Sequence, residues 1–217
     1  MPWLLFGGAM SQPMLFRVAG PHETPPTRTD GRITGDRYYT PQPVATVLVE
    51  QIAPLLDGAT VWEAHVGGGA FALACQRAGA IVSVSDIDPN AAGLGMVETW
   101  PVVASHSALD GWPWPEVEAP EWVVGNPPYD EAEAHIRAAL GVARVGVAFL
   151  LRASILSSRG RMALWTAPAP IRLARIYYLA GRPSFDGTGR TDAVDYVWLV
   201  WLRGHDGEPV ARWVEIP

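Results

Sequence analysis

The chain has 217 residues, of which 49% are hydrophobic, and a formal net charge of −6 at pH 7. This length and composition predict one globular domain with a substantial core. No apolar run approaches the roughly 18 residues needed to cross a bilayer. No basic residue precedes the short apolar stretch 1–6, so we expect no signal peptide. Cys75 is the only cysteine, which excludes an internal disulfide and fits a reducing cytoplasm.

The basic side chains are all arginines, because the chain contains no lysine. Residues 137–190 are rich in arginine and contain Asp186 as their only acid, whereas residues 110–133 hold seven acids and no arginine. A local basic face can bind phosphate groups although the total charge is negative. The pattern is therefore compatible with a nucleic-acid partner, and the alternative is a solvated arginine-rich surface.

The first 32 residues show no hydrophobic period. We interpret residues 1–32 as an irregular N-terminal arm and residues 33–217 as the single folded domain. The first periodic segment is 43–56, whose apolar residues fall on one face of a helix. Thr40 is placed to cap this predicted helix, and Pro41 suits its first turn.

The segment 59–72 is typical of a strand, a glycine-rich turn and a helix. Glu63 ends the predicted strand, and the glycines at 67–69 allow a ligand to approach the backbone closely. His65 lies inside the turn and has no histidine or cysteine partners at metal-ligand spacing, which favours a role in lining the turn or a ligand. The five histidines of the chain form no ligand-spaced cluster, so no metal site is expected.

A second buried strand is predicted at 80–86 and ends in Asp86. An acid about twenty residues after a glycine-rich turn can accept both ribose hydroxyls of a bound nucleoside. NAD-binding folds share this spacing, but Ala72 stands where the dinucleotide fingerprint requires its last glycine. A third strand and its exit are predicted at 102–109.

The most informative stretch is Asn126-Pro127-Pro128-Tyr129, which follows the short run 122–125. The run predicts a buried strand, and the two prolines end it in a stiff loop. Open α/β sheets bind ligands at the carboxyl ends of their strands. The Asn126 amide and the Pro127 carbonyl offer two acceptors beside the Tyr129 ring, which suits a planar base with an exocyclic amino group. A proline-rich turn without such a role is the alternative.

The second half of the chain predicts a helix at 131–142, a strand at 145–151, and two paired strands at 176–179 and 196–202. The paired strands are joined by residues 181–192, a long polar loop rich in glycine. Loops of this kind are usually functional or mobile.

The Asn-Pro-Pro-Tyr stretch, residues 126–129, resembles the catalytic motif of the class I S-adenosylmethionine-dependent amino-methyltransferases, above all the small, phage-type N6-adenine DNA methyltransferases. The resemblance implies a Rossmann-like α/β fold with a seven-stranded, mostly parallel sheet, an antiparallel last strand and helices on both faces. It also implies S-adenosyl-L-methionine as the cofactor, DNA rather than RNA as the partner, and a bacterial or phage-infected cell as the setting. Asn126, Pro127, Pro128 and Tyr129 are the implied catalytic residues.

Other segments resemble the cofactor-binding motifs of the same family. The resemblance implies that the segment 39–41 closes over the methionine end of the cofactor and that Asp86 accepts from its ribose. Gly68 and Ser107 stand where aspartate is common in the family. The implied cofactor-binding residues are Tyr39, Thr40, Pro41, Glu63, His65, Gly67, Gly69, Asp86, Ile87, Ser107, Ala108 and Asn126.

The loop between the last two predicted strands resembles the segment that contacts the extruded base in this family. The resemblance implies that Phe185 makes this contact from the side opposite Tyr129. Arg182 and Arg190 of this loop are candidates to hold phosphates, and the alternative is that they pair with Asp186 and Asp192.

The acceptor of the methyl group stays open at this point. Similar loops methylate cytosine N4 in DNA, adenine in RNA or a glutamine amide in a protein. A degenerate methyltransferase fold that serves as a binding module is a further alternative, which the departures at Gly68 and Ser107 motivate. We expect the catalytic core to use nearly all of these 217 residues, without a separate target-recognition domain. We therefore expect low sequence specificity or a very short recognition site.

Overall fold

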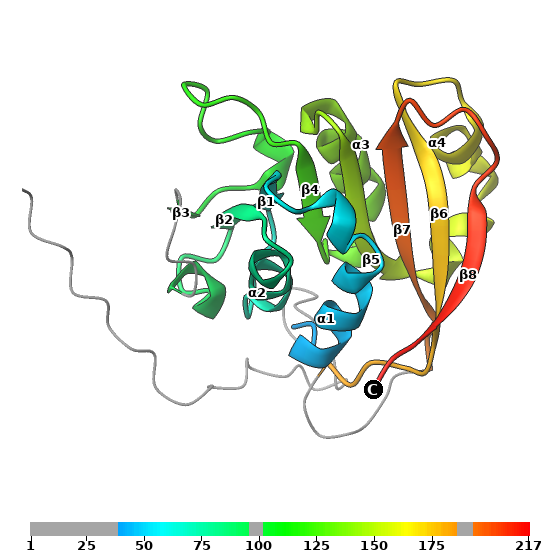
Figure 1. Ribbon diagram of the computed structural model, residues 1–217, viewed down its shortest axis with the longest axis horizontal. Helices are drawn as coiled ribbons and strands as arrows, with labels where there is room; N and C mark the ends of the chain where they lie inside the picture. Colours follow the sequence, from blue (N-terminus) through cyan, green and yellow to red (C-terminus); the bar gives the residue numbers. More distant parts are fainter. Residues whose placement is uncertain (1–38, 96–101, 186–192) are drawn as a thin grey trace, which may run out of the picture.

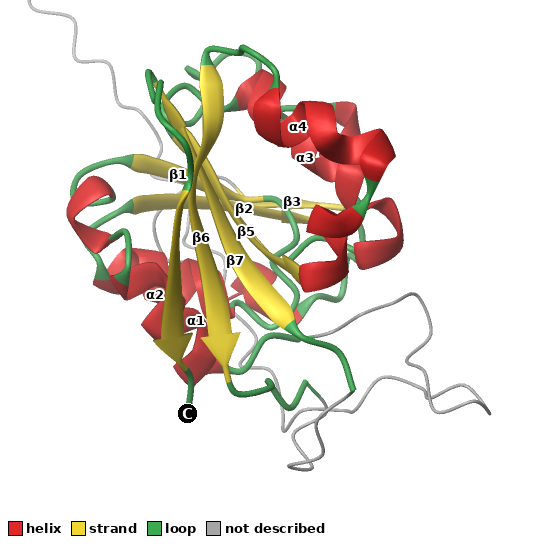
Figure 2. Ribbon diagram, turned by 90° about the vertical axis from the view of Figure 1, so that its right-hand side faces the viewer, coloured by secondary structure: helices red, strands yellow, loops and turns green. Residues whose placement is uncertain are grey.

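The computed structural model describes residues 39–95, 102–185 and 193–217 of the chain (Figure 1). The predicted N-terminal arm, residues 1–32, lies outside this part, and so does Arg190. The described residues form a mixed sheet with helices on both faces (Figure 2). The predicted α/β fold class is therefore confirmed.

The sheet has eight strands in the described part of the chain, in the spatial order β3-β2-β1-β4-β5-β7-β6-β8. The first five of these strands run parallel to one another. Their carboxyl ends therefore meet at one edge of the sheet. In chain order the strands are β1 (Thr60–Glu63), β2 (Ile81–Asp86), β3 (Val102–Ala104), β4 (Trp122–Gly125), β5 (Gly146–Arg152), β6 (Ile171–Ala180), β7 (Tyr196–Arg203) and β8 (Val210–Glu215).

The last strands complete the sheet in a different way from the sequence-based prediction. β7 lies between β5 and β6 and runs antiparallel to both, which confirms the predicted pairing of 176–179 with 196–202. The predicted count of seven strands is one too few, because β8 follows β7 and pairs parallel with β6. Only Val214 of the β8 residues is buried. The apolar and polar side chains of β8 also do not alternate along Val210–Glu215, and this alternation is the pattern by which a half-buried strand is recognised in a sequence.

The described helices are α1 (Gln42–Glu50), α2 (Ala70–Arg77), α3 (Ala132–Val142) and α4 (Met162–Thr166). Figure 2 shows α1 and α2 on one face of the sheet and α3 and α4 on the other. The helix predicted at 43–56 ends earlier, at Glu50, and a separate single turn follows it at Ala53–Leu55. Pro54 has no N–H to continue the helical hydrogen bonds. No helix among the described residues is long and apolar enough to span a membrane.

Large aromatic side chains fill the core and connect its layers. Trp62, Trp122, Trp198 and Trp201 are fully buried. The ring of Phe71 in α2 stacks on Trp198 in β7, with 5.1 Å between ring centroids and 5° between ring planes. This contact joins α2 to β7, a strand that lies more than a hundred residues later in the sequence.

Gly146 at the start of β5 has no room for a side chain. A Cβ atom there would lie 2.6 Å from Cζ3 of Trp122 and 2.8 Å from the carbonyl oxygen of Trp201. We expect Gly146→Ala to lower the free energy of unfolding by about 1–3 kcal/mol, as overpacking of a well-packed core does. Urea unfolding followed by tryptophan fluorescence measures this change.

Gly141 in α3 supplies the matched control, because a Cβ atom there meets nothing within 4 Å. Gly141→Ala is expected to raise the free energy of unfolding by up to about 1 kcal/mol through helix propensity. Equal effects of the two substitutions would contradict the steric explanation.

Candidate active site

Three loops converge at the edge of the sheet where the parallel strands end. The glycine-rich turn follows β1, Asp86 ends β2, and the loop that starts with Asn126 follows β4. β1 lies between β2 and β4 in the sheet, so the glycine-rich turn lies between the other two loops. This is the edge at which open α/β sheets bind their ligands.

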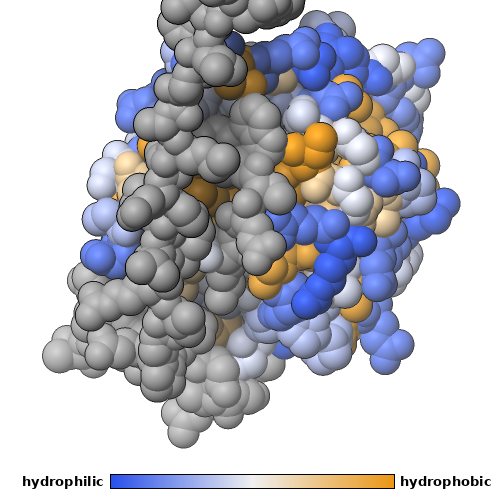
Figure 3. All heavy atoms as spheres, turned by 60° about the vertical axis from the view of Figure 1, so that its left-hand side comes forward, coloured by the Kyte–Doolittle hydropathy of each residue, from blue (hydrophilic) through white to orange (hydrophobic). Residues whose placement is uncertain are grey.

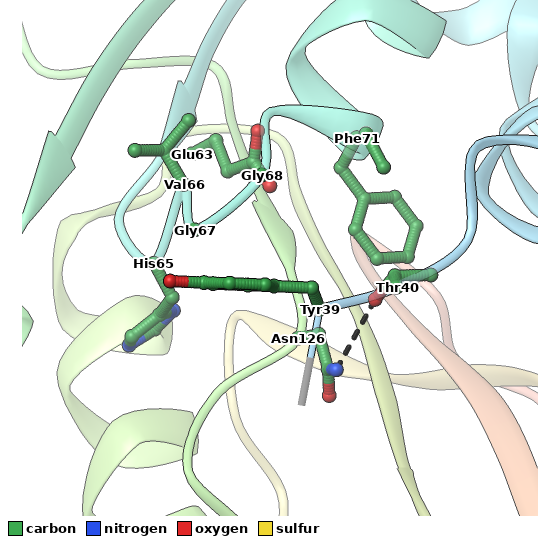
Figure 4. Close-up of a pocket in the computed structure, with 10 residues that line it drawn as sticks. Tyr39, Thr40, Glu63, His65, Val66, Gly67, Gly68, Phe71 and Asn126 are labelled. Atoms are coloured by element: carbon green, nitrogen blue, oxygen red, sulfur yellow. Dashed lines mark hydrogen bonds between the residues drawn. The ribbon is translucent and has the colours of Figure 1, made fainter. Parts of the chain in front are cut away.

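Two cavities open between these loops, and both are lined by Tyr39, His65, Gly67 and Asn126. The smaller cavity holds about 240 Å³ of free space, part of it open to solvent, and reaches Glu63. The larger cavity holds about 1080 Å³, part of it open to solvent. Figure 4 shows the Tyr39 ring beneath Gly67, with its hydroxyl end toward His65. Tyr39 thus lies between a small inner compartment and a wider outer one.

The glycine-rich turn is held in place by the acid at the end of β2. Asp86 Oδ2 accepts a hydrogen bond of 2.9 Å from the Gly67 N–H, and Oδ1 accepts one of 2.8 Å from the Asp88 N–H. Gly67 has a φ of +47°, and a Cβ atom there would lie 2.8 Å from Cδ1 of Tyr39. A residue with a side chain would therefore be strained at this position and would push the Tyr39 ring away. Gly69 has a φ of +80° and forms the N-cap of α2.

Glu63 places a buried carboxyl group in the inner cavity. Its side chain is 2% exposed. Burial raises the pKa of Glu63 well above its ordinary value, and the nearby charge of Asp86 adds to this shift. Glu63 Oε2 accepts no hydrogen bond from any residue that the structure describes. A buried carboxylate is costly unless it is paired with a positive charge. The Glu63 carboxyl group therefore suits a ligand that brings a cationic group into the cavity.

Asn126 points its amide into both cavities and is tied to the segment before α1. Its Nδ2 donates a hydrogen bond of 3.1 Å to Thr40 Oγ1 (Figure 4). Thr40 is therefore not the helix cap that the sequence suggests, since Pro41 is the N-cap of α1 and no side chain caps it. Nδ2 is the donor of this bond, and Oδ1 is the acceptor end of the same amide.

Tyr129 belongs to an aromatic cluster with residues from two other parts of the chain. Its side chain is 9% exposed, and the Arg152 guanidinium lies over the ring at 4.7 Å from the centroid. The Tyr196 ring lies 5.7 Å from that of Tyr129 and 5.1 Å from that of Phe185. Tyr196 therefore packs against both rings and connects Phe185 with Tyr129. Pro127 of the same loop is buried.

The outer cavity extends along the ends of β2 and β3. Asp86, Ile87, Ser107 and Ala108 line it together, and Pro128 lines the side toward β4. Figure 3 shows apolar surface exposed between hydrophilic side chains on the side of the molecule where β3 lies in Figure 1. Ile87 is 65% exposed, which leaves an apolar side chain uncovered beside a polar cavity. Ser107 Oγ accepts a hydrogen bond of 3.2 Å from the Leu109 N–H.

The wall of the outer cavity contains a pair of histidines that was not predicted from the sequence. His65 Nε2 and His135 Nδ1 are 2.9 Å apart, although the two residues are 70 positions apart in sequence. Their rings meet edge to face, with 4.5 Å between centroids. Burial lowers the pKa of both imidazoles. The one signal in the sequence is that His135 lies on α3, the helix that follows the Asn126 loop, while His65 lies in the glycine-rich turn beside that loop.

Many arginines in the second half of the chain form ion pairs or hydrogen bonds with other residues of the protein. Arg182 pairs with Asp195 at 3.2 Å, and the loop aspartates Asp186 and Asp192 lie outside the described residues. Glu133 binds both Arg137 and Arg161, and these bonds lower its pKa. The other described arginines that bind acids or backbone carbonyls are Arg144, Arg172, Arg175 and Arg203.

No group of three or more potential metal-ligating side chains occurs in the described part of the chain.

No protein-family model and no curated protein matches the sequence. Solved structures are similar in fold. A proposed RNA methyltransferase from Pyrococcus horikoshii has a TM-score of 0.63 and 13% identity over 77% of this chain and 86% of its own. The magnesium protoporphyrin IX methyltransferase from Synechocystis PCC 6803, solved with bound SAM, has a TM-score of 0.53 and 19% identity over 75% of this chain and 79% of its own. The chain has the class I methyltransferase fold.

A larger protein shares this methyltransferase fold. The M protein of the type I restriction enzyme EcoKI has a TM-score of 0.60 and 12% identity over 81% of this chain. The match covers 46% of the M protein, so the chain spans about half its length. At sequence identities this low, the structural similarity establishes the fold alone, and the chemistry must be argued from the site itself.

Proposed function

We propose that this chain transfers the methyl group of S-adenosyl-L-methionine to an exocyclic amino group, and that the acceptor is adenine N6 in DNA. One observation carries the proposal: the Asn126 amide opens into the same cavity as the glycine-rich turn and the buried Glu63. A hydrogen-bond acceptor for an amino group thus lies beside a site that suits a cationic ligand.

The cofactor would be held by residues of both cavities, and it supplies a methyl group activated by a positively charged sulfur. The Glu63 carboxyl group offers an acceptor for the cofactor's ammonium group, and the backbone at Gly67 and Gly69 borders it. Asp86 is placed to accept from the ribose hydroxyls while it holds the glycine-rich turn. The residues assigned to the adenine ring and to the lid are Ile87, Ser107, Ala108, Tyr39, Thr40, Pro41 and His65.

Asn126 and Pro127 would activate the acceptor. The lone pair of an exocyclic amino group is delocalised into the ring, which makes the nitrogen a poor nucleophile. Hydrogen bonds from the amino group to Asn126 Oδ1 and to the Pro127 carbonyl favour a tetrahedral nitrogen whose lone pair is localised. The rate gain then comes from positioning and from fixed dipoles.

Adenine in DNA fits the aromatic cluster next to this loop. A duplex hides the N6 atom, so the base must be single-stranded or turned out of the helix. Tyr129 and Phe185 would contact the extruded base. The base would then have to displace the Arg152 guanidinium from the face of the Tyr129 ring. Arg182 and Arg190 are the proposed phosphate contacts, and Arg182 would exchange Asp195 for a phosphate. The DNA-modifying neighbour supports this acceptor, whereas the archaeal neighbour supports RNA.

Methyl transfer from tritiated S-adenosylmethionine to DNA, RNA and protein, measured side by side with nucleoside analysis of the product, tests the proposal. We expect N6-methyladenine in DNA. Label only in RNA, in cytosine or in a glutamine side chain would replace the acceptor, and a chain that binds no cofactor in calorimetry would be a binding module. Mapping the modified bases also tests the expected short recognition site.

The bond between Thr40 and Asn126 provides a specific test of the proposed amide orientation. We expect Thr40→Val to lower the rate of methyl transfer about fivefold, since a hydrogen bond of this kind contributes about 1 kcal/mol. Thr40→Ser keeps the hydroxyl group and is expected to keep the rate. Single-turnover kinetics at saturating cofactor measures both, and equal rates for the two variants would contradict the role of the bond.

A further inference from the structure

The pair of His65 and His135 joins the glycine-rich turn to α3, the helix that follows the Asn126 loop. Both rings line the same cavity as Asn126 and Pro128. We propose that the histidine pair accepts the proton that the acceptor nitrogen loses when it is methylated. This inference rests on the proposed function, and adds to it a destination for the proton.

The proton must leave for the reaction to balance. The acceptor nitrogen forms a bond to the methyl carbon while the carbon–sulfur bond breaks, and the electron pair of that bond stays on sulfur. One N–H bond of the acceptor then breaks, and its proton passes to a ring nitrogen of the pair. The positive charge that began on sulfur ends on an imidazole, and the methylated amine is left neutral.

The hydrogen bond within the pair suits this role. Only one of the two facing nitrogens carries a hydrogen, because the other must accept. When His135 Nδ1 donates, His135 Nε2 is unprotonated and can take a proton. The bridging proton can then move to His65 Nε2, so that both rings share the charge. A second proton would set two N–H groups against each other across 2.9 Å, so the pair takes up one proton only.

The surroundings keep the pair uncharged before the reaction. Burial lowers the pKa of His65 well below its ordinary value, and His135 adds to this shift. Burial also lowers the pKa of His135, although Glu131 raises it in part. A neutral pair near neutral pH is what a proton acceptor requires. The other titratable groups around the two cavities are Tyr39 before α1, Glu63 of β1, Asp86 at the end of β2, Asp88 after β2, and His106 after β3.

His135→Gln tests the proposal, since glutamine can still bind His65 but has no basic nitrogen. In the unsubstituted protein, we expect the single-turnover rate at saturating cofactor to fall as the pH is lowered and the pair becomes charged. We expect His135→Gln to be about a hundredfold slower near neutral pH, as for the loss of a general base, and to lose this acid limb. Imidazole added to His135→Ala should restore part of the rate.

The control is His205→Gln, because His205 follows β7 and lies at the opposite edge of the sheet. This variant is expected to keep the rate and the pH profile. His65→Gln is a second variant, expected to keep a reduced rate because His135 retains its basic nitrogen, and it decides the question if His135→Gln does not fold.

Two readouts separate this inference from the proposed function. Failure of the unsubstituted protein to bind S-adenosylmethionine or to methylate any acceptor would remove the proposed function itself. With an active protein, an unchanged rate or an unchanged acid limb in His135→Gln would overturn the proton-acceptor role. NMR titration of the free protein should show one proton taken up jointly by His65 and His135, below the ordinary histidine pKa. Two independent protonations would also overturn the role.

Discussion

Asn126→Ala is expected to leave the affinity for S-adenosylmethionine nearly intact and to slow methyl transfer by about a hundredfold or more, as for the loss of a preorganised transition-state contact. The alanine removes the amide oxygen proposed to hold the acceptor amino group, whereas Glu63 and the glycine-rich turn stay in place. Single-turnover methyl transfer gives the rate, and calorimetry gives the affinity.

Gln51→Ala is the matched control for this variant. Gln51 lies just after α1, and its side-chain amide donates to the Val47 carbonyl, away from both cavities. The control removes an amide of similar chemistry and is expected to change neither the rate nor the affinity. Unchanged turnover of Asn126→Ala would refute the role given to Asn126, and a large loss of cofactor affinity would make it a cofactor ligand instead.

Glu63→Gln is expected to weaken S-adenosylmethionine binding by about tenfold to a hundredfold, because a hydrogen bond to a charged group contributes about 1.5–3 kcal/mol. Glutamine has nearly the same shape, so the cavity keeps its size and loses only the negative charge. Binding of a cation favours the charged form of Glu63. The affinity of the unsubstituted protein should therefore rise with pH until it passes the raised pKa of Glu63, and that of Glu63→Gln should not.

The pH dependence of the free energy of unfolding provides an independent test of the raised pKa of Glu63. The folded state holds a proton on Glu63 more tightly than the unfolded state, because burial raises the pKa of Glu63 above its ordinary 4.5. The contribution of Glu63 to the free energy of unfolding is therefore greatest below pH 4.5 and falls as the pH rises through the folded-state pKa. Glu63→Gln should remove this part of the pH dependence, as measured by urea unfolding at several pH values.

The exposed Glu50 at the end of α1 is a matched carboxylate outside both cavities. Glu50→Gln is expected to change neither cofactor affinity nor the pH dependence of stability that is assigned to Glu63. Parallel behaviour of the two variants would show that net charge, and not the buried carboxyl group, controls binding.

The parts of the fold that follow from local chemistry could be predicted from the sequence. The prolines at 127 and 128 end β4 wherever the rest of the chain lies, and the positive φ of Gly67 and Gly69 is available to glycine at little cost. The alternation and spacing of apolar residues indicate the buried strands in the same way. Strand order then brings the loops together.

Contacts between distant residues could not be predicted in this way. Nothing near His65 in the sequence indicates that its ring meets His135, and nothing near Arg182 indicates Asp195 as its partner. Asp86 was predicted to bind a ribose, yet its carboxylate also holds the Gly67 N–H, which only the pairing of β1 with β2 brings within reach.

The position of β7 has a consequence for the biosynthesis of the protein. β7 leaves the ribosome after β1 to β6, yet it lies inside the sheet between β5 and β6, and its Trp198 packs on Phe71 of α2. The nascent chain therefore carries a gap in its sheet until β7 has emerged, with the edges of β5 and β6 uncovered. Such intermediates are prone to aggregate. We expect ribosome-stalled chains that end before β7 to depend strongly on chaperones, and chains that include β7 and β8 to lose that dependence once they are released.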